Sequence, residues 1–96
     1  MRVELHPEAL LELEAAVSWY EEQGPGMGER FIESVDDAFA RAAEAPFAWP
    51  ILEEDIRRVL TRVFPYAILY TSEPDRIHVI AVMHCHRKPG YWRNRI

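Results

Sequence analysis

Cysteine, glycine and long apolar runs are scarce in this sequence of 96 residues. The single cysteine, Cys85, excludes an internal disulfide and is typical of a reducing compartment. No run approaches the roughly 20 apolar residues of a membrane-spanning helix, and the start, Met1-Arg2-Val3-Glu4, lacks the apolar core of a secretion signal. We therefore expect a cytoplasmic protein with no membrane partner.

Common catalytic and ligand-binding motifs are missing as well. Gly24, Gly26 and Gly28 fall between two helical patterns, whereas a phosphate-binding glycine loop follows a strand. No serine stands in a nucleophile elbow, and Cys85 has no orienting partner in the sequence. The consecutive residues His84-Cys85-His86 alternate between the two faces of a strand, and no Cys-x-x-Cys pair accompanies them. We therefore expect neither a metal site nor a cofactor.

The composition is that of a globular protein. Apolar residues make up 49 % of the chain and charged residues 28 %. A chain of 96 residues provides for one hydrophobic core of ordinary size. We predict a single domain over residues 1–96.

The net charge of -5 is divided unevenly along the chain. Residues 1–56 contain 14 acidic side chains and three arginines, a net of -11, whereas residues 57–96 contain two acidic and eight basic side chains, a net of +6. A local basic face can attract an anionic partner even when the whole chain is acidic. The alternative is that the acidic and basic halves neutralise each other within one fold.

Apolar periodicity predicts helices in the first half of the chain and strands in the second. We expect a strand over Arg2–Leu5, helices over Pro7–Gln23 and about Gly28–Ala45, and strands over Ile56–Phe64, Tyr66–Thr71 and Arg76–His84. A left-handed Gly24 followed by Pro25 is expected to end the first helix. Trp49, in a proline-containing connector, is expected to pack against the core. The order predicts an α+β fold in which a helical hairpin covers one face of a sheet.

Strand alternation places Arg58 and Arg62 on one face of the predicted strand Ile56–Phe64, with Val59 and Val63 facing inward. The two arginines are then about 13 Å apart on the open face of the sheet, at a rise of about 3.3 Å per residue. Planar guanidinium groups at this spacing suit successive phosphates or carboxylates. The competing interpretation is that exposed strands carry arginine for solubility and edge protection.

The last thirteen residues combine imidazoles, permanent cations and two aromatic rings. Such groups are typical of nucleic-acid contacts and of acid–base chemistry on a phosphodiester. His84 or His86 and Tyr91 are the candidate base and acid of a metal-independent ribonuclease, which also needs cations on the phosphorane. Arg87 is a candidate for that cation. The alternative for Tyr91 and Trp92 is an aromatic latch that closes the core.

Four blocks follow one another in a recognisable order: Ala15-Ala16-Val17-Ser18-Trp19-Tyr20-Glu21, Pro25-Gly26-Met27-Gly28-Glu29-Arg30-Phe31, Arg58-Val59-Leu60 through Phe64-Pro65-Tyr66-Ala67-Ile68-Leu69-Tyr70, and Ile80-Ala81-Val82-Met83-His84-Cys85-His86-Arg87-Lys88-Pro89-Gly90-Tyr91-Trp92. Together they resemble the RelE/ParE family of type II toxin-antitoxin toxins over nearly the whole chain. The resemblance implies a short N-terminal strand, a helical hairpin and a curved antiparallel sheet, in the order β-α-α-β-β-β. It also implies a bacterial origin, a role in plasmid stabilization and a cognate antitoxin encoded by a neighbouring gene.

The family contains two activities. RelE-type members cut mRNA in the ribosomal A site, and ParE-type members poison DNA gyrase. The nuclease branch has basic residues on the second and third strands and an Arg and a Tyr near the C-terminus. The nearest matches here are Arg58, Arg62, Arg87 and Tyr91. That branch also has an Arg directly after the Tyr of the third strand, whereas Tyr66 is followed here by Ala67. The Trp-Tyr-Glu helix and the Phe-Pro-Tyr strand are more similar to the ParE branch.

The resemblance therefore predicts a toxin that is neutralised by its antitoxin and poisons DNA gyrase; the alternative is a ribosome-dependent mRNA endoribonuclease without a metal ion. Further alternatives are a member with little toxicity and a nucleic-acid-binding module without toxicity. The catalytic candidates are Arg58, Arg62, His84, His86, Arg87 and Tyr91. The residues expected to bind the target are Arg87, Lys88, Trp92, Arg93 and Arg95. Those expected to bind the antitoxin are Leu10, Trp19, Phe39, Arg58, Arg62 and Arg87. A homodimer and a toxin-antitoxin hetero-oligomer are both compatible with the sequence.

Overall fold

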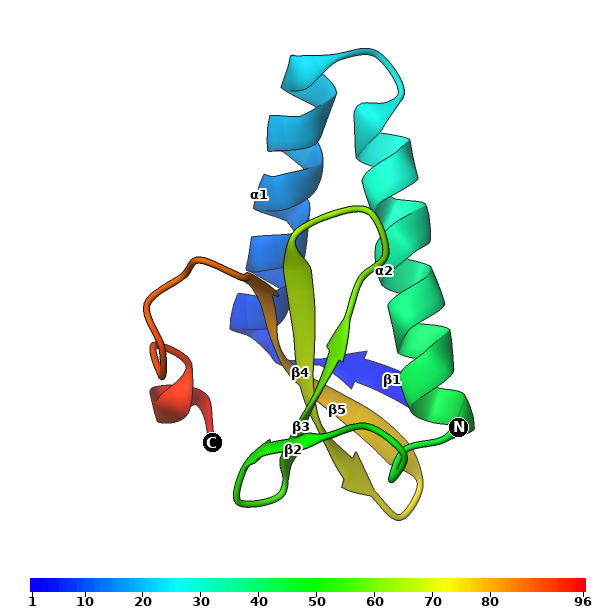
Figure 1. The fold of residues 1–96 in the computed structure, drawn as a ribbon, viewed down its shortest axis with the longest axis vertical. Helices are drawn as coiled ribbons and strands as arrows, with labels where there is room; N and C mark the ends of the chain where they lie inside the picture. Colours follow the sequence, from blue (N-terminus) through cyan, green and yellow to red (C-terminus); the bar gives the residue numbers. More distant parts are fainter.

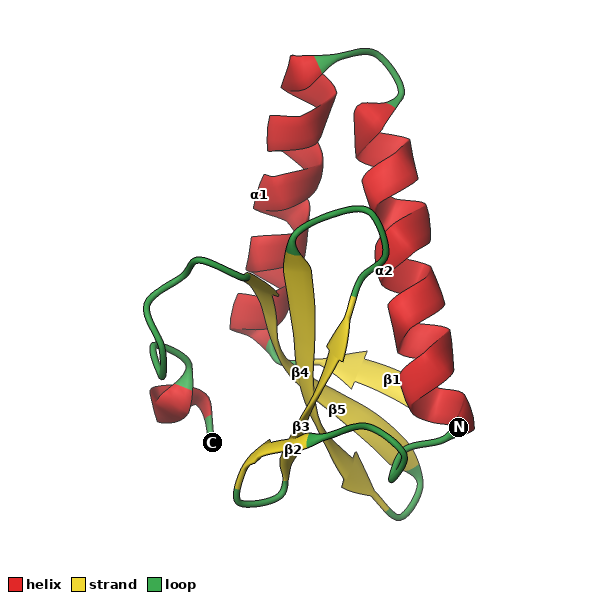
Figure 2. Cartoon of the chain, viewed as in Figure 1, coloured by secondary structure: helices red, strands yellow, loops and turns green.

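Two long helices cover one face of a five-stranded sheet (Figures 1 and 2). The computed structural model describes residues 1–96. Its elements are β1 (Arg2–Leu5), α1 (Pro7–Gln23), α2 (Met27–Glu44), β2 (Ile51–Glu53), β3 (Ile56–Leu60), β4 (Tyr66–Glu73), β5 (Arg76–His84) and a 3-10 turn, η1 (Arg93–Arg95). The predicted α+β fold is confirmed, and both helices lie within one or two residues of their predicted bounds. Neither helix combines the length and the apolar character that crossing a membrane requires.

The sheet is mixed rather than wholly antiparallel. Its strand order is β1-β5-β4-β3-β2, and β1 runs parallel to β5 while the other neighbours are antiparallel. Parallel neighbours need a long connection, and the chain between β1 and β5 contains the whole helical hairpin and the other three strands. The short edge strand β2 was not predicted, because only three residues form it.

The turn between the helices differs from its prediction. Gly24 has an extended backbone with a φ of 174°, whereas the left-handed glycine is Gly26, with a φ of 85°, immediately before α2. The carboxylate of Glu21 accepts hydrogen bonds from the backbone N–H groups of Gly26 and Gly28 at 3.2 and 3.0 Å. These bonds satisfy donors that the first turn of a helix leaves free. Glu21 therefore fixes the turn that the glycines permit.

The face of the sheet under the helices holds the larger core. An aromatic cluster forms one part of this core. In it, Tyr20 of α1 stacks on Phe31 of α2 and contacts Phe64 and Tyr66 edge to face. Phe39 also packs against this core. The buried members are Ala9, Ala16, Phe31, Val35, Ala38, Ala42, Val59, Phe64, Ile68, Tyr70, Ile77, Val79 and Val82. Trp49 packs on its margin as predicted and donates from Nε1 to the carbonyl of Arg41 at 3.1 Å.

The opposite face holds a smaller core of Ile56, Ala67, Leu69, Ile80, Ala81 and Trp92. A register shift in the β4–β5 ladder pairs Leu69 with Ala81 and Tyr70 with Val79. Ile80 is therefore an extra residue, and it joins Ala81 on the same face of the sheet. Residues 85–96, which we call the C-terminal strap, provide Trp92 to cover this face.

Strand β3 ends at Leu60, four residues earlier than predicted. The hydroxyl of Thr61 donates to the carbonyl of Phe64 at 2.8 Å, which turns the chain back toward β4. Val63, predicted to face inward, is 88 % exposed with a left-handed φ of 74°. Arg62 consequently leaves the plane of the sheet and lies against α2.

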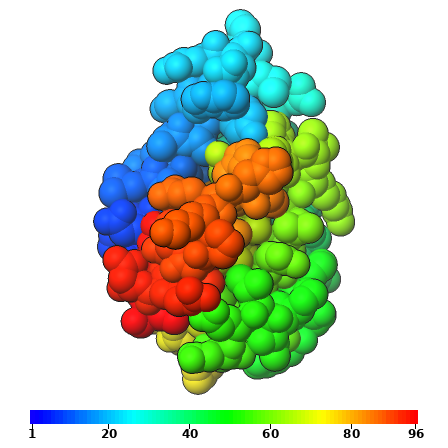
Figure 3. All heavy atoms as spheres, turned by 60° about the vertical axis from the view of Figure 1, so that its left-hand side comes forward, coloured from blue at the N-terminus to red at the C-terminus, as the bar shows by residue number.

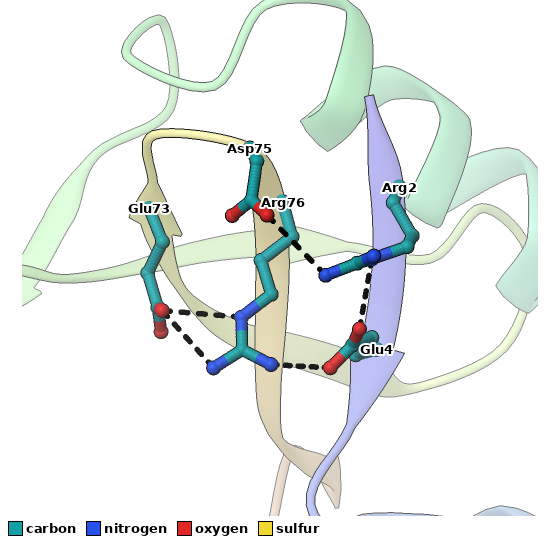
Figure 4. Close-up of polar contacts among 5 residues, drawn as sticks. All are labelled: Arg2, Glu4, Glu73, Asp75 and Arg76. Carbon is teal, nitrogen blue, oxygen red and sulfur yellow. Dashed lines mark hydrogen bonds and ion pairs between the residues drawn. The ribbon is translucent and has the colours of Figure 1, made fainter.

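Ion pairs line the outer edge of the sheet (Figure 4). Arg76 of β5 pairs with Glu4 of β1 and with Glu73 at 3.0 Å. Arg2 pairs with Glu4 at 2.8 Å and with Asp75 at 3.4 Å. Charged side chains along an edge strand hinder the addition of another strand, although exposed pairs of this kind stabilise little. The edge is therefore occupied by internal pairs.

Candidate functional site

The C-terminal strap lies between α1 and the β2–β3 region on the surface of the molecule (Figure 3). It leaves the end of β5 at His84 and turns through a bond from the N–H of Arg87 to the carbonyl of His84, at 2.9 Å. It then returns across the sheet to η1. Most of the basic residues predicted to be functional belong to this segment, so its attachment decides which of them are free.

Glu12 of α1 is the main attachment point of the strap. Its carboxylate accepts hydrogen bonds from Tyr91 Oη at 2.5 Å and from both terminal nitrogens of Arg95 at 2.7 and 3.2 Å. It also accepts the backbone N–H of Val82 at 3.1 Å, and Arg95 donates to the carbonyl of Ile80 at 3.0 Å. β1 ends at Leu5, so the backbone groups of Ile80 and Val82 have no neighbouring strand on that side. The bonds to Arg95 and Glu12 satisfy these groups instead.

The pair between Glu12 and Arg95 is nearly buried, with 15 % and 9 % of the two side chains exposed. Its geometry is bidentate, the form in which a guanidinium binds a carboxylate most strongly. The bond to Glu12 raises the pKa of Arg95. Burial, and then the bond to Glu12, raises the pKa of Tyr91 well above its ordinary value.

Three of the five residues predicted to bind a target are therefore engaged within the fold. Trp92 is 2 % exposed, which places it in the core and excludes it from a surface contact. Arg95 is held by Glu12, and Arg93 forms a bidentate pair with Glu53 at 2.7 and 2.9 Å. The bond from Arg93 lowers the pKa of Glu53. The aromatic latch, the alternative interpretation of Tyr91 and Trp92, describes their placement.

Arg87 and Lys88 remain exposed on the strap. The guanidinium of Arg87 forms no hydrogen bond or ion pair with any side chain and stacks over the ring of Tyr91, with 4.1 Å from Cζ to the ring centroid. Arg95 lies 5.0 Å from the same centroid. The ring of Tyr91 therefore contacts two guanidinium groups: that of Arg95, which is paired with Glu12, and that of Arg87, which has no carboxylate partner.

The structure separates the two arginines predicted to share the open face. Arg58 of β3 is exposed on that face, and no side-chain partner engages it. Together with Arg87, it lines a pocket of about 260 Å³ between β3 and the strap. Arg62 lies beyond the end of β3 at Leu60, and its Nη1 is 3.6 Å from Oδ1 of Asp37 on α2. The predicted pair Arg58 and Arg62 on one face is wrong for this reason.

The two histidines lie at the end of β5. Nδ1 of His84 accepts the backbone N–H of His86 at 3.0 Å, and the two rings are 5.3 Å apart. The neutral ring of His84 therefore carries its proton on Nε2. His84 also contacts the ring of Tyr66, whose pKa is raised by burial. His86 is exposed.

A second pocket, of about 300 Å³, opens between α1 and the end of β5. Its walls are Glu12, Ala15, Ala16, Trp19, Tyr66, Val82, His84 and Arg87. Of the three apolar residues predicted to contact an antitoxin, only Trp19 lines this pocket, and it is 55 % exposed. Leu10 is exposed elsewhere on α1, and Phe39 packs against the core, so the three do not form one groove.

Glu12 is the central residue that the sequence prediction missed. The helical pattern of α1 predicts Glu12 on the solvated side together with Glu8, Glu14, Glu21 and Glu22, and for Glu12 this prediction is wrong, because its carboxylate is bonded to Tyr91 and Arg95. A signal was present: Glu12 lies three residues after the buried Ala9 and four before the buried Ala16, on the apolar stripe of the helix. A lone carboxylate in such a stripe needs a buried partner. The chain places no group of three or more His, Cys, Asp or Glu side chains where they could hold a metal ion.

The fold and the site together define a class of protein, a helical hairpin on a sheet whose second face carries a cationic C-terminal strap. The family model of the ParE toxin of the type II toxin-antitoxin system parDE matches residues 3–89. The chain therefore belongs to the ParE toxin family of type II toxin-antitoxin systems.

Among solved structures, a chain of the chromosomal ParDE TA system from P. aeruginosa is similar, with a TM-score of 0.62 and 13 % sequence identity. The similarity covers 88 % of this chain and 95 % of that one. At this identity the likeness is one of fold. No curated protein sequence matches the chain.

Proposed function

We propose that this chain is a toxin that acts by binding DNA gyrase, and that a cognate antitoxin neutralises it by covering its basic surface. The observation that carries the choice of target is Ala67. It stands where the nuclease branch has an arginine, and it is 1 % exposed within the small core that Trp92 closes. No cation occupies that position, and the other members of its cluster are the apolar side chains of Ile56, Leu69, Ile80, Ala81 and Trp92.

Tyr91 and His84, two of the three candidate acid–base residues of the nuclease alternative, are also engaged within the fold, whereas His86 is exposed. The hydroxyl of Tyr91 donates to Glu12, and its raised pKa disfavours loss of the proton. Nδ1 of His84 is an acceptor for a backbone N–H, so the neutral ring has no free basic nitrogen. Removal of one preorganised donor typically costs about a hundredfold to a thousandfold in rate. Efficient cleavage of mRNA is therefore disfavoured.

Binding alone requires only complementary surface, and the free cations provide it. Arg87, Lys88 and Arg58 are exposed with no carboxylate partner. We assign target contact to these three and not to the internally paired Arg93 and Arg95. The same three cations attract an acidic antitoxin, which supports neutralisation by direct cover.

One observation favours the endoribonuclease as a second candidate. Arg87 and His84 line one pocket, and the Nε2–H of a neutral His84 can donate a hydrogen bond to a phosphate oxygen beside Arg87. The lining of this pocket contains no second cation, and its one carboxylate, Glu12, is bonded to Tyr91 and Arg95. We further propose that residues 1–96 act as one domain in the bacterial cytoplasm.

The test adds purified protein separately to a gyrase supercoiling assay and to programmed ribosomes with labelled mRNA. We expect trapped gyrase cleavage complexes and intact mRNA. Arg87→Glu should abolish both gyrase trapping and growth arrest, whereas Arg30→Glu, a matched change of an exposed arginine on α2, should leave them unchanged. A specific A-site cut that disappears in Arg87→Ala would replace the gyrase proposal with the nuclease.

A further inference from the structure

The pocket between α1 and the end of β5 is built from an apolar floor and a cationic mouth. Ala15 and Ala16 of α1 and Val82 of β5 contribute small or apolar surface, and Trp19 and Tyr66 contribute aromatic walls. Its volume of about 300 Å³ accommodates one large side chain. A half-exposed tryptophan beside such a pocket is a typical anchor of a protein interface.

The charges around the pocket select the ligand. Glu12 is the one acidic residue in the lining, and all of its bonding capacity faces Arg95, Tyr91 and the N–H of Val82. Arg87 at the mouth has no carboxylate partner. The pocket therefore presents one uncompensated positive charge next to apolar walls.

The free arginine is also held in place. Stacking on Tyr91 restrains its guanidinium, and Tyr91 is itself tied to Glu12 through its hydroxyl. A restrained side chain loses less conformational entropy on binding than a mobile one. Glu12 and Tyr91 thus hold Arg87 in position beside the pocket.

We infer that this pocket is the anchor site for the antitoxin, and that it takes one aromatic or branched aliphatic side chain flanked by an Asp or Glu that pairs with Arg87. The inference rests on the proposed function, because it assumes that an antitoxin exists. It adds the place and the chemistry of the contact. Since Arg87 is also assigned to the gyrase contact, an antitoxin seated here blocks the toxin by occupying the same residue.

The experiment measures the dissociation constant between this chain and the purified product of the adjacent reading frame. Ala15→Trp fills the pocket from an exposed helix position, and Arg87→Glu reverses its charge. We expect each change to weaken binding about thirtyfold or more, as at interface hot spots. The matched controls are Ala40→Trp and Arg30→Glu, the same two kinds of change at exposed positions of α2, and both should leave binding within about threefold of the unmodified chain.

Trp19→Ala, at an exposed position that tolerates truncation, provides a second variant should Ala15→Trp fail to fold, and it should weaken binding about tenfold. Full-strength binding by Ala15→Trp and Trp19→Ala would overturn the anchor pocket while leaving the toxin proposal intact. Absence of binding by the unmodified chain would instead overturn the proposed antitoxin, and the anchor pocket with it.

Discussion

The two faces of the sheet are covered in different ways. Two helices pack on one face through aromatic and branched apolar side chains, with Phe31 fully buried at its centre. The other face is covered by a strap without regular secondary structure except η1, held by Trp92 and by ion pairs to Glu12 and Glu53. Apolar packing depends little on salt or pH, whereas polar attachment depends on both.

The difference indicates where a toxin of this design can change without losing its fold. The helix-covered face supplies most of the apolar burial, so it governs global stability. The strap carries the free cations Arg87 and Lys88, and its position depends on a few named bonds. Local opening of such a segment costs less than global unfolding.

The largest expected effect tests the helix-covered face. Phe31→Ala should lower the free energy of unfolding by about 4 kcal/mol, because it removes a fully buried ring from a packed cluster. Urea denaturation followed by circular dichroism measures the change. Phe47→Ala is the matched control, since Phe47 is 71 % exposed and its loss should cost no more than about 0.5 kcal/mol. Equal costs for the two would show that the helices do not carry the stability.

The next effect tests the strap. Glu12→Ala leaves the buried Arg95 without its partner and should lower the free energy of unfolding by about 3 kcal/mol. This loss of stability is at the lower end of the range for breaking a buried ion pair, because release of the strap exposes Arg95 to water. Hydrogen exchange should show lost protection in residues 85–96 while α2 stays protected. Glu14→Ala, at an exposed position of the same helix, should change neither reading. Uniform loss of protection would contradict a separate strap.

The smallest effect concerns alkaline pH. The pKa of Tyr91 is raised in the folded state above its ordinary value of 10.0, so the folded protein keeps the proton longer than the unfolded chain. The resulting stabilisation is fully present below about pH 10 and is lost as the pH rises through the folded pKa. Burial raises the pKa values of Tyr20, Tyr66 and Tyr70 in the same direction.

Tyr91→Phe isolates the contribution of Tyr91. Urea midpoints compared between about pH 8 and about pH 11 should fall less in this variant than in the unmodified chain. The ring still stacks under Arg87, so gyrase trapping near neutral pH should persist. If the urea midpoint falls equally in the two proteins, Tyr91 does not contribute to the pH dependence of stability.

Much of the fold followed from local spacing. The apolar stripe of α1, the Pro7 start and the Gln23 end appear in the sequence as they do in the structure. Strand β5, Arg76–His84, has its predicted bounds, because both of its alternating sets are apolar and both of its faces are covered. The exposure of Arg58 followed from alternation along β3. In each case the deciding neighbours are within a few residues.

The site was decided by contacts between distant parts of the chain. Arg62 was misplaced because Thr61 turns the chain through bonds to Phe64 and Tyr66 that alternation does not encode. Tyr91 and Arg95 became structural residues because Glu12, about 80 positions earlier, meets them across the end of β5. A sequence shows which charges a chain carries and how they repeat. Only the tertiary structure decides which of these charges are paired, because pairing requires distances of about 3 Å between residues that are far apart in the chain. Arg87 and Lys88 stayed free for that reason.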